Sequence, residues 1–539
     1  MSGRFRDIFG KTALLGALLG VIVLLATPVF SQPQVMAGEL PGSGKYLKPD
    51  ILKEFYEQRG WKPVWLRGSG SFQPRVDAMI RLLDDSWTHG LNPERYRLSE
   101  IKELRASAKG EDRLTLDIVL SDAAIRYVND LTGMRGLRES GDRKIKYWRE
   151  PLDANAILTL VSDNADPIAK LRALEPSNNL YQSLRSELVR LTALSAEENT
   201  QPVSLKAPLR PGKTSAQAPL IRARLGLPVN EAAPHVYDEP LAVAVMKLQK
   251  ANGVDTDGVI WGRTLEILNM TREAKIWQIL VNMERLRWVS MGRPDKYVLV
   301  NIPSASLWAV EGGSVKLEMP VIIGKTARPT YSFKTEITGV RFNPNWTVPP
   351  TIKNKDFLPM LQQDPEALVK RGIRITYQGK EVDPTKVDWA TVTSKGLANV
   401  KMIQSPGDDN PLGKVRVIME NPYNIYLHDT NHREMFEQGE RALSSGCIRV
   451  SQPEKLADFI LSENEGWSWD KMSKMIDSGR MRDVPTETPI PVFITYQTVW
   501  LDSDGRLVYG RDVYGQDANL AEILKKAGAV HLPQQPEKI

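Results

Sequence analysis

The chain has 539 residues, of which 42% are hydrophobic and 25% charged, and its formal net charge is +6. This length is more than one hydrophobic core supports, and the composition is that of globular protein rather than disorder. The charges are interspersed along the chain instead of clustered, which argues against a nucleic-acid-binding protein.

The N-terminus has the pattern of an export signal. Three basic residues precede an uninterrupted apolar run from Ala13 to Ala26. This pattern predicts a signal peptide or membrane anchor at residues 1–37, with cleavage sites after Ser31 and after Ala37. An uncleaved anchor stays open, because the apolar stretch nearly reaches the roughly 20 residues that span a bilayer. In both cases the remaining chain lies outside the cytoplasm.

Residues 46–195 have a helical pattern, and we expect a helical domain there, which the family resemblance given below identifies as a scaffold domain. Apolar residues recur at the i, i+3, i+4, i+7 spacing of one helix face at Val76, Met79, Ile80 and Leu83. Three aromatic residues flank a Gly-Trp-Lys-Pro turn, and we expect them to close a small core rather than to bind sugars: Tyr56, Trp61 and Trp65.

A compact unit follows at residues 204–270, for which we expect three short helices. Gln249 ends the second helix, and an Asp-Gly turn at Asp257 and Gly258 follows it. This unit resembles the peptidoglycan-binding type 1 module. The alternative is a three-helix spacer that binds no ligand.

From residue 295 the hydrophobic period becomes that of strands, and we expect a catalytic domain over 295–515. Short β-branched runs separated by turn residues predict a β-rich, sandwich-like fold; these runs are 297–301, 307–310, 319–324, 340–344, 415–419, 424–428, 491–496 and 507–509. Strand signals become sparse over 353–398, which predicts a helical or lid insertion. Residues 516–539 are expected to be a C-terminal tail. The chain as a whole is thus predicted to be a multidomain α+β protein.

The single cysteine of the chain, Cys447, is its most informative residue. It follows Ser445 and Gly446 and comes nineteen positions after His428. A thiol with a pKa of about 8.5 is mostly protonated at neutral pH, and a nearby histidine can take its proton. Backbone N–H groups near Gly446 and Cys447 are candidate oxyanion donors, each worth about 2.7–4 kcal/mol of barrier. The pattern indicates a cysteine nucleophile with a histidine base.

Two local motifs carry a family resemblance. Residues 426–430 (Tyr-Leu-His-Asp-Thr) and 444–450 (Ser-Ser-Gly-Cys-Ile-Arg-Val) resemble the signature of the L,D-transpeptidases with a YkuD-like catalytic domain. Flanking segments, among them 342–350 and 410–413, resemble the large YcbB-type branch of that family. Asn431 departs from the proline often found there, and Ser445 stands where many relatives have histidine.

The resemblance implies a role for each matched residue. Cys447 would be the nucleophile and His428 the general base. His432, the rival base, lies in a polar turn, and Asp429 is left out because neighbouring residues on a strand point to opposite faces. Four further residues complete the implied site: Ser445 and Gly446 would shape the thiolate pocket and oxyanion hole, Arg449 would hold the loop or contact substrate charge, and Tyr426 would line the substrate pocket.

The implied reaction is acyl transfer between peptidoglycan stem peptides, giving a 3→3 cross-link in the cell wall. It needs no metal or other cofactor. The resemblance also implies acylation by carbapenems, a periplasmic location (secreted, or anchored to the outer face of the inner membrane), and wall synthases as partners.

Several alternatives remain open at the level of sequence. The same site could use water, as an L,D-carboxypeptidase, or a lipoprotein lysine as the acceptor. A cysteine peptidase of the NlpC/P60 kind is disfavoured, because there the cysteine precedes the histidine. A non-catalytic wall-binding scaffold is the third class, and a Cys447 pKa no lower than about 8.5 would favour it.

Overall fold

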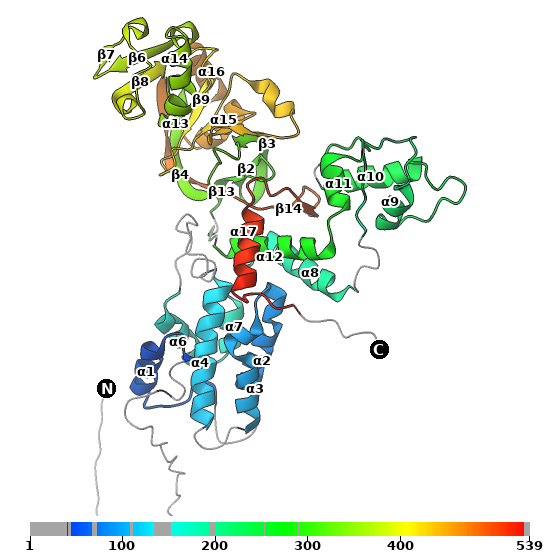
Figure 1. The fold of residues 1–539 in the computed structure, drawn as a ribbon. Helices are drawn as coiled ribbons and strands as arrows, with labels where there is room; N and C mark the ends of the chain where they lie inside the picture. Colours follow the sequence, from blue (N-terminus) through cyan, green and yellow to red (C-terminus); the bar gives the residue numbers. More distant parts are fainter. Residues whose placement is uncertain are drawn as a thin grey trace, which may run out of the picture.

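The computed structural model describes residues 40, 45–66, 73–107, 112–133, 152–194, 201–252, 254–288, 292 and 294–532. The leader predicted at 1–37 lies outside the described residues. Among the helices that are described, none has the length and apolar character needed to cross a bilayer. Figure 1 shows the helical region and the β-rich region at opposite ends, with α12 and α17 between them.

The helical region packs around one long buried helix, α4 (Asp112–Leu131). The carboxylate of Asp117 on α4 accepts the N–H groups of residues 64–66 at 2.8, 2.8 and 2.9 Å, which fixes the turn after the first helix. Tyr56 and Trp65 are fully buried in this core, so the expectation of packing is confirmed for both. The other helices are α1 (Pro49–Gln58), α2 (Pro74–Asp84), α3 (Leu98–Ser107), α6 (Ala154–Ser162), α7 (Pro167–Arg172) and α8 (Asn179–Ala193).

The small unit after residue 201 has a core of its own. Gln249 links its helices to the following turn: its side-chain amide donates to Asp257 at 2.8 Å, and its side-chain oxygen accepts the N–H of Gly258 at 2.8 Å. Gly258 has a φ of +70°, a conformation that glycine adopts without strain. The helices are α9 (Ala218–Arg224), α10 (Glu239–Ala251) and α11 (Gly262–Leu268).

Two helices from distant parts of the sequence connect these regions to the sheet (Figure 1). α12 (Arg272–Trp288) packs against α8 on one side and against α17 (Gln516–Lys526) on another. Residues 516–526, expected to belong to a tail, are therefore a packed helix, with Leu520 and Leu524 forming its buried face. A short hairpin, β14 (Val499–Leu501) and β15 (Leu507–Tyr509), leads into this helix.

The β-rich region is a nine-stranded mixed sheet of order β11-β3-β12-β10-β9-β4-β13-β1-β2. Strand β3 also pairs with β2, so the sheet closes on itself around its core instead of forming two separate sheets. Helices α15 (Pro453–Leu461) and α16 (Trp469–Asp477) contribute to that core. The strands are β1 (Lys296–Asn301), β2 (Ser306–Glu311), β3 (Ser314–Gly324), β4 (Phe333–Phe342), β9 (Val415–Ile418), β10 (Leu427–His428), β11 (Ala442–Ser444), β12 (Ile448–Val450) and β13 (Arg482–Thr495).

The segment between β4 and β9 forms a subdomain with its own sheet, of order β5-β8-β6-β7, and its own core. We expected an insertion at 353–398 with few strands, but strands lie both inside that range and on its borders. In β6, Ile373 and Ile375 alternate toward the core. The elements are β5 (Trp346–Thr347), α13 (Pro350–Ile352), α14 (Leu358–Gln363), β6 (Ile373–Tyr377), β7 (Lys380–Glu381) and β8 (Val400–Gln404).

Candidate active site

Three neighbouring strands place the candidate residues on one face of the sheet. His428 on β10 is paired with Arg449 on the parallel strand β12 and with Arg416 on the antiparallel strand β9. Leu427 and Ile448, which alternate with these residues, are fully buried in the core. Because side chains alternate along a strand and paired residues share a face, His428, Arg449 and Arg416 lie together on the side away from the core.

Cys447 lies one residue before β12, beside Tyr426 at the start of β10. The N–H of Ile448 donates to the carbonyl of Tyr426 at 2.9 Å, which extends the parallel pairing to this point. The N–H of Tyr426 donates to the cysteine sulfur, and the thiol lies 3.7 Å from the carbonyl oxygen of Asn424. Cys447 is half-buried and, by alternation, shares the face of Arg449.

The ring of His428 is buried and held in one orientation. Its exposed fraction is 5%, and its Nδ1 atom lies 2.5 Å from the backbone carbonyl oxygen of Asp429. Burial first, and then the charges of Arg449 and Arg416, lower the pKa of His428 to about 3, against the opposing effect of that carbonyl. The ring is therefore neutral at physiological pH. With Nδ1–H donating to a carbonyl, Nε2 is left to accept a proton.

The carboxylate of Asp429 forms its hydrogen bonds with the chain around the end of β10, and not with the imidazole of His428. It accepts the N–H groups of Lys414 and Thr430 at 2.8 and 2.7 Å, and Arg433 donates to it at 2.9 Å. Burial raises the pKa of this carboxyl. Asp429 thus acts on His428 through its backbone carbonyl.

The loop before the cysteine is fixed by Ser444, which sequence reasoning did not select. Its buried hydroxyl accepts the N–H of Gly446 at 3.0 Å and donates to the carbonyl of Cys447 at 2.6 Å. Gly446 has a φ of +115°, which favours glycine. Of the two N–H groups expected to donate to an oxyanion, that of Gly446 is therefore engaged, and that of Cys447 has no hydrogen-bond partner among the described residues.

Ser445 points out of this loop. Its hydroxyl is exposed and accepts a hydrogen bond from Arg328 at 3.0 Å. Arg328 also forms a two-point ion pair with Asp356 of the insertion, with both distances 2.6 Å. The structure therefore places Ser445 where the loop of residues 444–447, called the catalytic loop below, contacts the insertion. The part of Ser445 in a thiolate pocket stays a prediction.

The two arginines beside His428 have different surroundings. Arg449 lies 3.4 Å from the hydroxyl of Thr430 and 3.3 Å from the sulfur of Met435. The guanidinium of Arg416 lies over the ring of Tyr426, 3.9 Å from its centroid. Sequence reasoning placed the strand of Arg416 but missed the residue; the signal was a charged residue between two apolar ones in Val-Arg-Val.

The rival base His432 has a half-exposed side chain that pairs with Glu434 at 3.1 Å. It is thus a solvated residue, as expected from its position in a polar turn.

Burial raises the pKa of the Cys447 thiol, against the N–H of Tyr426 and the charges of Arg416 and Arg449. This is the direction expected above for a non-catalytic domain. The neighbouring His428 is neutral, however, and a neutral thiol with a neutral imidazole is the starting state of a general-base mechanism. A thiol that loses its proton as it attacks does not need a low resting pKa.

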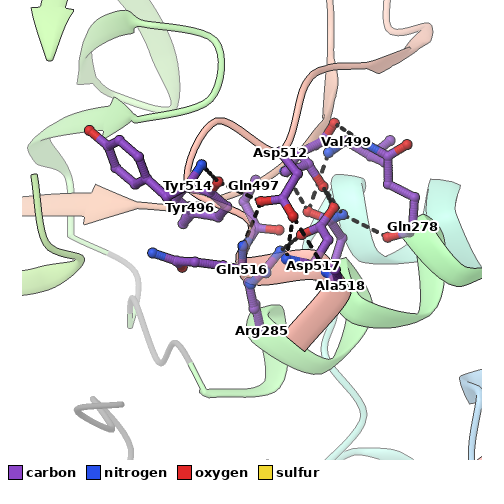
Figure 2. A network of polar contacts seen from close by, with 12 residues as sticks. Gln278, Arg285, Tyr496, Gln497, Val499, Asp512, Tyr514, Gln516, Asp517 and Ala518 are labelled. Atoms are coloured by element: carbon purple, nitrogen blue, oxygen red, sulfur yellow. Dashed lines mark hydrogen bonds and ion pairs between the residues drawn. The ribbon is translucent and has the colours of Figure 1, made fainter. Parts of the chain in front are cut away.

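A polar network joins α12 and α17 to the end of β13 (Figure 2). The carboxylate of Asp512 accepts the hydroxyl of Tyr496 at 2.6 Å and the N–H groups of Gln516 and Asp517 at 2.8 and 2.7 Å. Asp517 pairs in turn with Arg285 of α12 at 2.5 Å. These contacts anchor the sheet to the connecting helices.

The same network reaches the catalytic loop through Tyr514. Its N–H donates to the hydroxyl of Tyr496 at 2.8 Å, and its own hydroxyl donates to Gly324 at 2.5 Å and accepts from the N–H of Thr330 at 3.2 Å. The hydroxyl of Thr330 donates to the carbonyl of Gly446 at 2.8 Å. Tyr514 is therefore linked to the catalytic loop through the hydrogen bonds of Thr330.

The described residues contain no group of three or more His, Cys, Asp or Glu side chains that could hold a metal ion.

Two parts of the chain match family models. Residues 50–188 match a family described as a scaffold domain, and residues 295–493 match the L,D-transpeptidase catalytic domain. The second match contains the whole of the sheet face described above, including Cys447 and His428.

Individual proteins are also similar to parts of this chain. One relative is a protein of Haemophilus influenzae whose name describes it as an inferred L,D-transpeptidase. It is 35% identical to this chain over 274 residues, which are 49% of this chain and 54% of that protein. The chain thus matches about half the length of this curated relative. Solved L,D-transpeptidases from Xylanimonas cellulosilytica and Stackebrandtia nassauensis are 12% and 13% identical, cover 55% of this chain and 100% and 97% of theirs, and give TM-scores of 0.18 and 0.19.

Proposed function

We propose that this chain, which carries an L,D-transpeptidase catalytic domain at residues 295–493, forms 3→3 cross-links between peptidoglycan stem peptides. The observation that carries the proposal is that His428, fixed through Nδ1, lies on the same face as Cys447. Cys447 can act as the nucleophile and His428 as the base, and this chemistry uses no cofactor. Membership of the large YcbB-type branch is part of the proposal.

In the first half-reaction Cys447 attacks the carbonyl carbon of the third residue, meso-diaminopimelate, of a donor tetrapeptide. The thiol proton passes to Nε2 of His428 as the S–C bond forms. The N–H of Cys447 would donate to the oxygen of the tetrahedral intermediate. The C–N bond to the terminal D-alanine then breaks, and His428 returns the proton to the leaving amine.

In the second half-reaction the side-chain amine of an acceptor diaminopimelate attacks the thioester. His428 takes a proton from this amine, the C–S bond breaks, and the thiolate recovers the proton. The products are the 3→3 cross-linked dimer and the free enzyme. Carbapenems would acylate Cys447 in the same way as the donor does.

The other regions have proposed roles around this chemistry. The contact of Arg328 with both Ser445 and Asp356 supports a lid function for the insertion, because it joins the insertion to the catalytic loop. The unit at 204–270 would bind the wall or act as a spacer. The leader at 1–37 would export the protein to the periplasm, cleaved or as an anchor in the inner membrane, where wall synthases are its expected partners.

The test uses the full-length protein, its Cys447→Ala and His428→Gln variants, and His432→Gln as a matched histidine control. Each is incubated with purified disaccharide-tetrapeptide and followed by mass spectrometry. We expect 3→3 dimer and free D-alanine from the wild type and from His432→Gln only.

Other products would identify the alternatives. Tripeptide and D-alanine without dimer would indicate an L,D-carboxypeptidase. Transfer only to an added lysine-containing lipoprotein peptide would indicate an anchoring transpeptidase. No turnover by the wild type would contradict the proposal and favour the non-catalytic scaffold.

A further inference from the structure

Arg416 faces the proposed general base across a strand pair. Arg416 of β9 and His428 of β10 are directly paired in the antiparallel register. Residues paired in this way have Cα atoms about 4.5–5.5 Å apart, and their side chains stand on the same face. Arg416 is also close enough to Cys447 for the two groups to influence each other's ionisation.

No carboxylate forms an ion pair with Arg416 among the residues that the structure describes, and the charge of Asp483 acts on it only from beyond ion-pair distance. Its guanidinium lies over the ring of Tyr426, and its Nε is buried without a hydrogen-bond partner. Arg341 is the neighbouring cation in the same row of the sheet, and in contrast it forms an ion pair with Asp483 at 2.6 and 2.7 Å. A buried donor without a partner carries a cost that a ligand can relieve.

The reaction brings a carboxylate to this position. The nitrogen that leaves the acyl donor must come within hydrogen-bond reach of His428 in order to receive its proton. In a donor whose leaving group is a single amino acid, the terminal carboxylate is attached to the carbon next to that nitrogen. A guanidinium held rigid on an aromatic ring is well suited to bind a carboxylate through two hydrogen bonds.

Building on the proposed function, we propose that Arg416 binds the terminal carboxylate of the leaving D-amino acid. Arg416 would thereby select donor stems that end one residue beyond the scissile bond. A stem with one residue more would place an amide, and no charge, opposite this guanidinium. Tyr426, which lies beneath the guanidinium, keeps it in position.

The test compares two donors that differ in one group: disaccharide-tetrapeptide with a terminal D-alanine, and the same donor with D-alaninamide. Release of D-alanine or D-alaninamide is measured for the wild type, Arg416→Gln and the matched control Arg341→Gln. We expect the wild type to prefer the carboxylate donor by about 10- to 100-fold in kcat/KM, the range for a hydrogen bond to a charged group. Arg416→Gln should lose this preference by slowing on the carboxylate donor alone, while Arg341→Gln keeps it.

Two results would overturn the inference while the proposed function stands. One is equal use of both donors by the wild type. The other is an equal loss on both donors in Arg416→Gln, which would show that Arg416 serves the thiol or the stacking instead. If the wild type uses neither donor, the proposed function itself fails.

Discussion

The Nδ1 atom of His428 lies 2.5 Å from the backbone carbonyl oxygen of Asp429. A backbone carbonyl thus does for this ring what a carboxylate does in many catalytic triads: it fixes the tautomer and the orientation. A carbonyl brings no negative charge to stabilise an imidazolium, in keeping with a neutral ring between two arginines. The orientation of His428 then depends on whatever holds the backbone at Asp429.

Gly413 leaves room for the side chain of Asp429, because it has no Cβ atom. A Cβ atom at this position would lie 2.2 Å from the Oδ2 atom of Asp429, and its φ is +57°. We expect Gly413→Ala to displace Asp429 and turn His428, which should lower kcat for D-alanine release by about 100-fold, as a misplacement near 1 Å does. Gly372→Ala is the matched control, because Gly372 has a similar φ of +68° and open space around it. Equal kcat values in the two variants would show that Asp429 does not orient the base.

The two serines before Gly446 should differ in importance. Ser444→Ala removes the acceptor of the Gly446 N–H and the donor to the Cys447 carbonyl. Loss of such a buried contact costs about 1–3 kcal/mol, which corresponds to a roughly 10- to 100-fold lower kcat if the loop geometry is lost. Ser445→Ala removes one exposed contact to Arg328 and should change kcat less than about threefold. Steady-state rates of the two variants decide the point, and the reverse order would support the thiolate-pocket role predicted for Ser445.

Tyr514 should matter for turnover although it lies behind the catalytic loop. Tyr514→Phe keeps the stacking on Tyr496 but removes the hydroxyl that bonds to Gly324 and Thr330. We expect kcat to fall by about tenfold, a cost of about 1–1.5 kcal/mol for the lost hydrogen bonds, with substrate KM little changed. The control is Tyr331→Phe, whose side chain is 43% exposed. A wild-type kcat in Tyr514→Phe would show that the loop holds its shape without this support.

The sequence was most informative where the chemistry is local. Cys447 and His428 could be selected as candidates because each is embedded in a short motif, and the structure places them on one face of the sheet. The strand that carries His428 could be predicted because a run of apolar residues leads up to it. Arg416 could not be predicted as part of the site, since only the pairing of β9 with β10 brings it opposite His428. The local pattern around Arg416 does not show which strand will pair with β9 or in which register.

Other differences have equally specific causes. The choice of Ser445 over Ser444 followed the family pattern, but pairing along β11 is irregular between residues 442 and 444, so alternation does not tell which hydroxyl turns inward. Residues 516–526 were expected to be a tail because only Leu520 and Leu524 form a buried face in a polar segment, and that face needs α12 to be stable. In both cases tertiary contacts decide what local pattern leaves open.

The depressed pKa of His428 should also be visible in stability. The folded ring titrates at about 3, against a reference value of 6.5. Between these values the unfolded chain binds one more proton than the folded chain. The free energy of unfolding contributed by His428 is therefore complete above pH 6.5 and is lost as the pH falls toward 3, with a slope of up to about 1.4 kcal/mol per pH unit.

His428→Gln removes this one proton and should flatten the acid side of the stability curve. Urea denaturation of the wild type and the variant from pH 4 to 8, followed through the transition of the catalytic domain, gives the difference in unfolding free energy. We expect that difference to be constant above pH 6.5 and to change steadily below it, because other acidic groups titrate equally in both proteins. If the stability curve of His428→Gln runs parallel to that of the wild type, the ring takes up a proton in the folded state near its usual pKa, and a neutral base at the start of the reaction is no longer tenable below that pH.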